Sequence, residues 1–285
     1  MRSAEYNHAN KVGNQGDLIK HFTLSLVAGD AELRRGAESF HYVETHAGRS
    51  EYLLDAKKLS DGWGAGVGRF LEQIHESGNQ YVDSSKMLID QLHKFASTVS
   101  FSQGRGSIRY FGSSGLFLTT LEERDVPCGS VLFDTNPDVC SELRSRNNEK
   151  NIIICESGYK GVRQLDQIDL LFVDPPDLKP APDGQFREWK DLIFYCINQE
   201  IPFVSWNPLY GRPTDTDEIP SQQSFECGIV EELARIQKLG YLSIRWSDWS
   251  EKMCGCQMLF NIVGGSLYVE QCNKLALMMG WKIEA

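Results

Sequence analysis

The feature of this sequence that most constrains its fold is a regular alternation of short β-rich runs with amphipathic helical stretches from residue 38 onward. Such alternation is typical of a parallel sheet with helices on both faces, because parallel strands need a crossover between them. We expect strands at Phe40–Glu44, Ile108–Phe111, Val131–Asp134, Ile152–Cys155, Leu170–Val173, Phe203–Trp206, Leu242–Trp246 and Gln257–Val263. The sequence therefore predicts an α/β fold with a doubly wound, mostly parallel sheet.

The segment 55–106 interrupts this alternation and is too long for a simple crossover. Apolar residues recur at helical spacing over residues 67–74 and 87–95. We therefore expect residues 55–106 to form a small helical insertion, and residues 1–54 and 107–285 to form the main domain. Gly64-Ala-Gly66-Val-Gly68 has a superficial likeness to a dinucleotide-binding loop, but it follows no predicted strand, which favours a turn at the amino end of a helix.

Several predicted strands end in polar residues or glycine, and ligands of open α/β sheets bind outside the carboxyl ends of the strands. An adenosyl cofactor needs a tight turn after the first strand, an acid after a later strand for the ribose, and a polar group near the adenine. The chain supplies these in order as His46-Ala47-Gly48, Asp134 and Ser157-Gly158. Taken singly, each residue is also typical of a helix cap or a turn.

The tetrapeptide Asp174-Pro175-Pro176-Asp177 follows the apolar run 168–173. The two prolines remove backbone donors and fix φ, which leaves Asp174 and nearby carbonyls as hydrogen-bond acceptors at a strand end. This arrangement suits an amino group that must be held while it attacks. Amino-methyltransferases that act on nucleobases carry a similar motif in which an aromatic residue follows the prolines, whereas Asp177 stands at that place here.

Composition limits the classes of function. The formal net charge of −10 makes the chain a poor general binder of nucleic acid, although local basic patches can coexist with it. No apolar stretch approaches the length of a membrane span, and the amino terminus lacks a signal pattern, so we expect a soluble, cytoplasmic protein. The eight cysteines form no Cys-x-x-Cys pair, and we expect no metal site.

The polar segment from Tyr6 to His21 leads into a predicted helix over residues 18–27. Polar detail of this density before a helix indicates a functional loop. An N-capping turn with Asn14 or Asp17 as the cap accounts for part of the same pattern.

The chain resembles the bacterial 23S ribosomal RNA adenine-N6 methyltransferases, a family once described as proteins for catabolism of external DNA. The residues that carry this resemblance are Tyr6-x-His8, Gly13-Asn14-x-x-Asp17-x-x-Lys20-His21, Thr45-His46-Ala47-Gly48, Tyr110-x-Gly112-Ser113 and Asp174-Pro175-Pro176. The resemblance implies a class I S-adenosylmethionine-dependent methyltransferase fold, S-adenosyl-L-methionine as cofactor, and 23S rRNA, protein-free or in early assembly, as substrate.

The resemblance also implies roles for particular residues. Asp174 would be the catalytic residue, and Tyr6 would gate the substrate. The cofactor contacts would be His21, His46, Ser113, Asp134, Ser157, Gly158 and Asp174.

This chain departs from the family near the predicted chemistry. Arg49-Ser50-Glu51 replaces a glycine-rich continuation, Asp134 stands where the family usually has Glu, and Ser157 where it usually has Asp. Asp177 replaces the aromatic residue that would stack on the flipped base, for which Tyr6, Phe186, Trp189 and Trp206 are the alternative candidates.

Other interpretations of the sequence stay open. They are a methyltransferase with a different acceptor, such as a free nucleotide, a protein or a small amine, and a degenerate methyltransferase fold linked to the use of external DNA. A metal-dependent nuclease with Glu156, Asp174 and Asp177 as ligands leaves the His-Ala-Gly turn and Asp134 unexplained.

Overall fold

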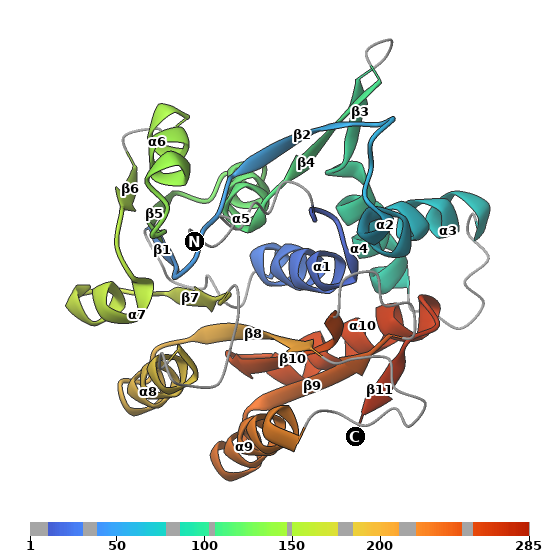
Figure 1. The fold of residues 1–285 in the computed structure, drawn as a ribbon. Helices are drawn as coiled ribbons and strands as arrows, with labels where there is room; N and C mark the ends of the chain where they lie inside the picture. Colours follow the sequence, from blue (N-terminus) through green and yellow to red (C-terminus); the bar gives the residue numbers. More distant parts are fainter. Residues whose placement is uncertain are drawn as a thin grey trace, which may run out of the picture.

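The centre of the molecule is an eight-stranded sheet with the order β11-β9-β10-β8-β7-β1-β5-β6 (Figure 1). The computed structural model describes residues 11–30, 39–77, 86–102, 106–146, 150–175, 185–210, 221–246 and 253–284. The strands β6, β5, β1, β7 and β8 are parallel neighbours, whereas β10 runs antiparallel to β8 and β9. The strands are β1 (Phe40–Glu44), β5 (Cys128–Phe133), β6 (Asn151–Ile154), β7 (Leu170–Val173), β8 (Phe203–Tyr210), β9 (Gly240–Arg245), β10 (Met253–Asn261) and β11 (Lys282–Glu284).

Helices cover both faces of this sheet, and each face has its own apolar core. Because side chains alternate along a strand, Tyr42 faces one core while Val43 faces the other. The first core includes residues of α1 (Gln15–Gly29), α5 (Ser113–Glu122) and α10 (Gly265–Met278). The second includes residues of α7 (Gly158–Gly161), α8 (Gln185–Asn198) and α9 (Ser221–Gln237). The helix α6 (Pro137–Ser145) connects β5 to β6. The predicted doubly wound, mostly parallel sheet is confirmed.

One predicted strand lies outside the main sheet. The strand β4 (Ser107–Phe111), expected as part of the main sheet, pairs with β2 (Glu51–Asp55) and β3 (Ser100–Ser102) in a separate antiparallel sheet. Tyr52 pairs with Tyr110 in this small sheet, and both side chains are buried. The residues of β4 therefore specify a strand with one buried face, which fits an antiparallel sheet better than the centre of a parallel one.

The segment 55–106 contains the expected helices. They are α2 (Asp61–Trp63), a π-helical turn η3 (Gly64–Gly68), α3 (Arg69–Ser77) and α4 (Lys86–Ser97), and the short β3 follows them. The glycine-rich run lies directly before α3, at the amino end of a helix as predicted. The division of the chain into a main domain and an insertion stays a prediction.

The helix α1 lies at the centre of the molecule (Figure 1). Asn14 caps it by accepting a 3.0 Å hydrogen bond from the backbone N–H of Asp17, which confirms one of the two expected caps. The η3 turn packs against this amino end, because the N–H of Val67 donates to the carbonyl of Gly13 at 2.8 Å. A Cβ atom on Gly66 would lie 2.3 Å from the same carbonyl, so the close approach of the two backbones requires glycine there.

Among the described residues, no helix has the length and apolar character needed to cross a bilayer. Within the same residues, His, Cys, Asp and Glu side chains do not gather in threes in the manner of a metal site.

Candidate functional site

The sheet order predicts a ligand-binding crevice at the carboxyl end of β1. The chain leaves β1 toward β5 and β6 on one side and later returns to β7 and β8 on the other, so β1 is the switch point of the sheet. Ligands of open α/β sheets bind at such a point. Asp134 follows β5, Ser157 follows β6 and Asp174 follows β7, so the fold places these predicted site residues at one edge of the sheet.

The turn after β1, residues 45–48, is held by both neighbouring strands. The Thr45 N–H donates to the carbonyl of Phe172 at 3.1 Å, and the Ala47 N–H donates to that of Phe133 at 2.8 Å. The Gly48 N–H donates to Asp134 Oδ2 at 3.0 Å. Gly48 has a φ of 58°, a conformation that favours glycine. This β1 turn is therefore fixed by backbone hydrogen bonds.

Gly158 packs directly on the backbone of the β1 turn. A Cβ atom at this position would lie 2.5 Å from the Cα of Thr45, so a larger residue would push the two turns apart. This contact places Ser157 and Tyr159, the two neighbours of Gly158, next to the β1 turn. The ring of Tyr159 meets that of His46 edge to face at a centroid distance of 4.9 Å. Its hydroxyl is buried and has no hydrogen-bond partner among the described residues.

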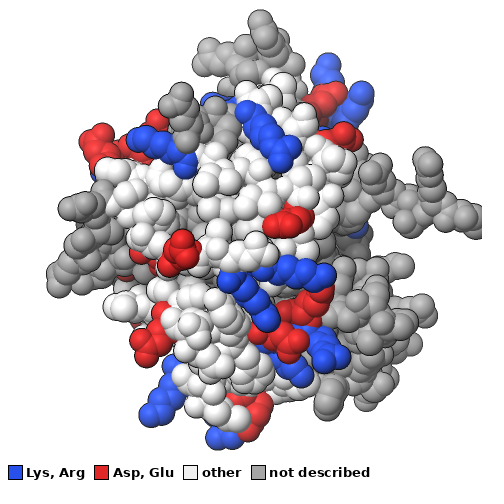
Figure 2. Space-filling model, turned by 90° about the vertical axis from the view of Figure 1, so that its left-hand side faces the viewer, with Lys and Arg blue, Asp and Glu red and all other residues white. Residues whose placement is uncertain are grey.

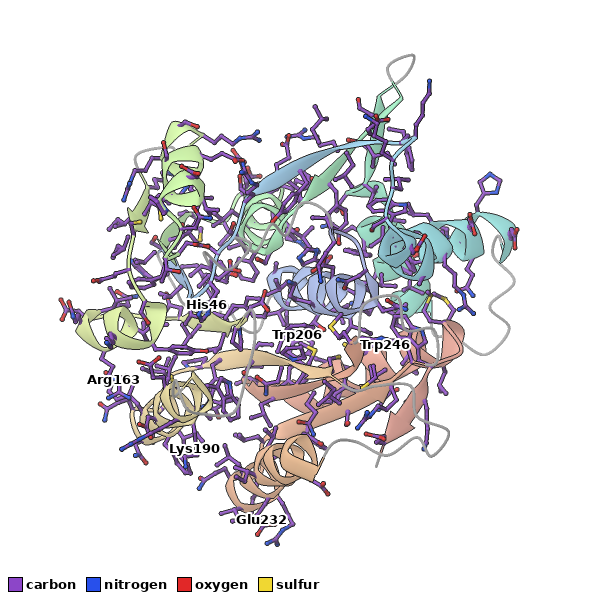
Figure 3. All side chains as sticks on the ribbon, viewed as in Figure 1. His46, Arg163, Lys190, Trp206, Glu232 and Trp246 are labelled. Atoms are coloured by element: carbon purple, nitrogen blue, oxygen red, sulfur yellow. The ribbon has the colours of Figure 1, made fainter. Side chains whose placement is uncertain are left out.

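His46 is neutral at neutral pH. Burial lowers the pKa of His46 to about 4, although its ring keeps some contact with solvent. Its Nδ1 shares a 2.8 Å hydrogen bond with the hydroxyl of Thr45. In Figure 3, His46 lies at the end of the sheet where β1 and β7 meet. The ring can therefore offer a neutral donor or acceptor to a ligand in the crevice.

A buried lysine holds the carboxylate of Asp174. Lys20 Nζ lies 2.8 Å from Asp174 Oδ2 and 3.0 Å from Asp17 Oδ1. Burial alone would lower the pKa of Lys20, but the two carboxylates outweigh it and raise this pKa well above its usual value. Asp17 in turn accepts the N–H of Gly13 at 2.8 Å. The Lys20 ammonium thus joins the start of α1 to the end of β7.

His21 and Ser113 also lie in this region and are tied to neighbours. His21 Nδ1 shares a 2.6 Å hydrogen bond with the Tyr110 hydroxyl. The Ser113 hydroxyl, at the start of α5, donates to Glu44 Oε1, and the Tyr42 hydroxyl donates to Glu44 Oε2 at 2.9 Å. A second carboxyl group, which the sequence reasoning did not name as a site residue, therefore lies near Asp174.

Glu44 is fully buried at the end of β1. Burial raises the pKa of Glu44 to about 8; the Ser113 hydrogen bond opposes this shift and the charge of Asp174 adds to it. The pattern Tyr42-Val-Glu44 offered a signal, since an acid that ends a buried strand must be paired or protonated. Lys20 was visible only as part of the amino-terminal motif, because its partner Asp174 is 154 residues away.

The structure narrows the choice of an aromatic platform. Trp189 is excluded, because its ring is fully buried and its Nε1 donates to Ser205 at 2.9 Å in the second core. Trp206 lies under α1, where Lys20 Nζ is 5.4 Å from the ring centroid (Figure 3). Tyr6, Pro176, Asp177 and the side chain of Phe186 lie outside the described part of the chain.

Two curated relatives are ribosomal RNA methyltransferases. The chain is 25% identical over 227 residues to the ribosomal RNA large subunit methyltransferase J of Haemophilus influenzae, which covers 73% of this chain and 71% of the relative. It is 26% identical over 179 residues to the Escherichia coli protein of the same name, which covers 60% of this chain and 58% of the relative. No protein-family model matches the chain.

A solved structure shares the fold. A Legionella pneumophila protein described under the family name DUF519 superposes with a TM-score of 0.70 at 17% identity, over 96% of this chain and 98% of that protein. The predicted resemblance to large-subunit rRNA methyltransferases is confirmed by the two curated relatives, and the predicted α/β fold is shared with the Legionella protein.

Proposed function

We propose that this chain is an S-adenosylmethionine-dependent methyltransferase that modifies large-subunit ribosomal RNA at the N6 amine of an adenine. The relatives and the fold support methyl transfer and the rRNA substrate. The choice of adenine N6 rests on the Asp174-Pro175-Pro176 motif and on the surroundings of Asp174.

The observation that carries the proposal is the Lys20–Asp174 pair. The Asp174 side chain is 11% exposed at the crevice, and the Lys20 ammonium 2.8 Å away favours its ionised form. A carboxylate accepts hydrogen bonds and donates none. Asp174 is therefore suited to accept an N–H from an exocyclic amine and to orient the nitrogen lone pair.

The residues near β1 fit the cofactor. The Asp134 carboxylate faces the β1 turn, where it accepts the N–H groups of Gly48 and Asn136 at 3.0 and 2.8 Å. Each carboxylate oxygen has a further lone pair for a ribose hydroxyl. Because position 158 requires glycine, only backbone atoms of this residue lie beside the β1 turn. The close approach of an adenosyl group to the protein requires backbone without a side chain at such a place. His21, His46, Ser113 and Ser157 would supply the other contacts. S-adenosyl-L-methionine, when bound, supplies an electrophilic methyl group.

The chain's own residues would act mainly by alignment. Asp174 would hold the amine and receive its proton, while the carbonyls beside Pro175 accept a second N–H. Alignment of two reacting groups can supply most of a rate enhancement without covalent help from the protein. A paired adenine would first have to be flipped out of its helix, and the resemblance implies that Tyr6 would act at this step.

A second acceptor class is favoured by the acidic character of the chain. The net charge of −10 and a carboxylate at position 177 both oppose a phosphate backbone. Across the face in Figure 2, basic and acidic side chains are interspersed, so the excess of acid is not gathered there. A free nucleotide or small amine is the corresponding alternative substrate. The rRNA proposal includes a cytoplasmic location.

The test is transfer of labelled methyl to protein-free 23S rRNA from a strain that lacks the modification. We expect one labelled N6-methyladenine after nuclease digestion, no label with Asp174→Ala, and normal labelling with Asp166→Ala, which changes an exposed acid. Calorimetric titration of S-adenosylmethionine is run in parallel. Cofactor binding without RNA labelling would refute the rRNA substrate, and the absence of binding would refute the methyltransferase.

Replacing Asp177 with Tyr separates the two acceptor classes. If the natural protein labels RNA poorly and Asp177→Tyr labels it strongly, position 177 is the missing stacking platform. Stacking on a base is worth roughly 1–3 kcal/mol, so a gain of about tenfold or more is expected.

A further inference from the structure

A cavity of about 570 Å³ lies beside the predicted cofactor residues and has no role in the proposed chemistry. Its walls come from the loop before α1, the residue after the β1 turn, β2, the loop 56–60, α2 and the end of α6. In Figure 1, β2 runs from the side of α6 toward α2, and both helices contribute residues to the lining of the cavity. The volume lies within the usual range for small-ligand sites.

The cavity adjoins the candidate active site. Arg49 lines it and directly follows Gly48, whose N–H binds Asp134. Tyr52 also lines it, and a Cβ atom on Gly48 would lie 3.5 Å from the Tyr52 hydroxyl. We expect a strand of RNA with one nucleotide at Asp174 to extend a neighbouring nucleotide toward this cavity.

The floor of the cavity is apolar and aromatic. Val12, Tyr52 and Trp63 are buried there, and Leu54 and Leu59 are partly buried. Leu53 stands at the mouth with 73% of its surface exposed. A flat apolar group would find contact along this floor.

The rim is charged, with both signs present in equal number. Arg49, Lys58 and Arg146 face Glu51, Asp55 and Glu142 around the opening. Ion pairs hold these groups in place, and one of them joins Arg49 to Glu142. Arg146 Nη1 lies 3.3 Å from Glu51 Oε1, and Arg109 Nη2 lies 2.6 Å from Glu51 Oε2. Arg49 and Glu51, two of the three residues that replace the family's glycine-rich turn, thus contribute to this rim.

The chemistry of the walls selects one class of ligand. A phosphate would meet as many carboxylates as cations, and a purely apolar ligand would bury charged groups without partners. A nucleobase has flat apolar faces and carries both donors and acceptors on its edges, which matches an aromatic floor and a mixed rim. We propose that this cavity binds a nucleobase of the RNA strand next to the target adenine, an inference that rests on the proposed function.

The test compares two triple variants that change the same residue types. The cavity variant is Leu53→Ala, Lys58→Ala and Arg146→Ala, and the matched control is Leu277→Ala, Lys282→Ala and Arg144→Ala, which are exposed residues outside the cavity. With protein-free 23S rRNA we expect the KM for RNA to rise about tenfold in the cavity variant, the factor for one lost stacking or edge contact. We expect kcat and the Kd for S-adenosylmethionine to match those of the control. Equal KM values for the two variants would overturn the proposal while leaving the proposed function in place.

A binding measurement separates failure of the cavity proposal from failure of the proposed function. If the natural protein methylates no rRNA, both variants are titrated with a fluorescent single-stranded RNA hexanucleotide at low salt. Weaker binding by the cavity variant alone would sustain the nucleobase site, and equal binding would overturn it. If the KM effect occurs with ribosomal particles but not with protein-free RNA, the cavity contacts a ribosomal protein and the proposal is wrong.

Discussion

Two carboxyl groups end neighbouring strands of the sheet, Glu44 on β1 and Asp174 after β7, yet their surroundings differ. Glu44 is fully buried and is bound by the hydroxyls of Tyr42 and Ser113. Asp174 reaches the crevice and is bound by the ammonium of Lys20. Burial raises the pKa of Glu44 to about 8 and keeps it largely protonated near neutral pH, although the hydrogen bonds from the two hydroxyls oppose this shift.

The comparison shows how the protein keeps one negative charge, not two, on the carboxyl groups at the ends of β1 and β7. Two ionised carboxylates so close together would repel, and the charge of Asp174 is one cause of the raised pKa of Glu44. The Lys20 ammonium lies beside Asp174, the carboxylate that reaches solvent. The proton stays on Glu44, which does not reach solvent. We therefore expect Asp174 to act on the substrate and Glu44 to hold the start of α5 in place.

The largest effect should separate the two carboxyl groups by activity. We expect Asp174→Asn to lower kcat about 10³-fold, within the range for a positioned proton acceptor, with an unchanged Kd for S-adenosylmethionine. Glu44→Gln keeps a neutral side chain of the same shape and should keep kcat within a few-fold. Single-turnover methyl transfer measures both, and equal losses would show that the two groups do not differ in role.

Removing the ammonium should cost stability. Lys20→Met would leave Asp17 and Asp174 buried without their cation, and such unpaired charges cost about 3 kcal/mol or more. Urea unfolding should show this loss, and Lys58→Met, which changes an exposed lysine, should stay within about 0.5 kcal/mol of the natural protein. The double variant Lys20→Met with Asp174→Asn should recover part of the loss, and additivity of the two changes would contradict the pairing.

The proton on Glu44 should make stability depend on pH. An acid whose pKa is raised on folding binds its proton more tightly when folded, so its contribution is complete below the unfolded pKa and is lost as pH rises toward about 8. Between these limits the slope is about 1.4 kcal/mol per pH unit. From pH 5.5 to 7.5, we expect the natural protein to lose about 2 kcal/mol relative to Glu44→Gln in denaturant titrations. If the free energy of unfolding depended on pH in the same way in both proteins, a protonated Glu44 would be refuted.

The smallest effect concerns the hydroxyl that binds Glu44. Ser113→Ala should cost about 1 kcal/mol, the usual net value of a hydrogen bond. It should also move the pH dependence of stability to higher pH, because this hydrogen bond opposes the raised pKa of Glu44. Ser114→Ala is the matched control, since the Ser114 hydroxyl is buried without a partner among the described residues. An identical pH shift in both variants would contradict the role of Ser113.

The sequence predicted seven of the eight strands of the main sheet, because each of these seven carries its own signal, whereas the short β11 was not predicted. The fully apolar run of β7 could only be a strand buried on both faces, and the acid that follows it marked the edge of the crevice. The polar strand ends, taken in order along the chain, then indicated the site, because parallel strands expose their carboxyl ends together.

The parts that the sequence did not predict depend on partners far along the chain. The residues of β4 indicated a strand, but the sheet to which a strand belongs depends on its partner, here β2. Lys20 and Glu44 look like ordinary helix and strand residues until Asp174 and Ser113 stand beside them. The charged rim around Arg49 likewise depends on α6, whose residues are about a hundred positions away in sequence.

The backbone contact between Gly66 and Gly13 has a consequence for any attempt to shorten this protein. Residues 55–106 look removable in the sequence, as an addition to a complete fold. Their η3 turn covers the loop that caps α1, the helix that carries Lys20. A deletion of this segment would uncover the buried amino end of that helix. In the shortened protein, Lys20 should then no longer be held beside Asp174. The apparent accessory is thus a structural support of the candidate active site.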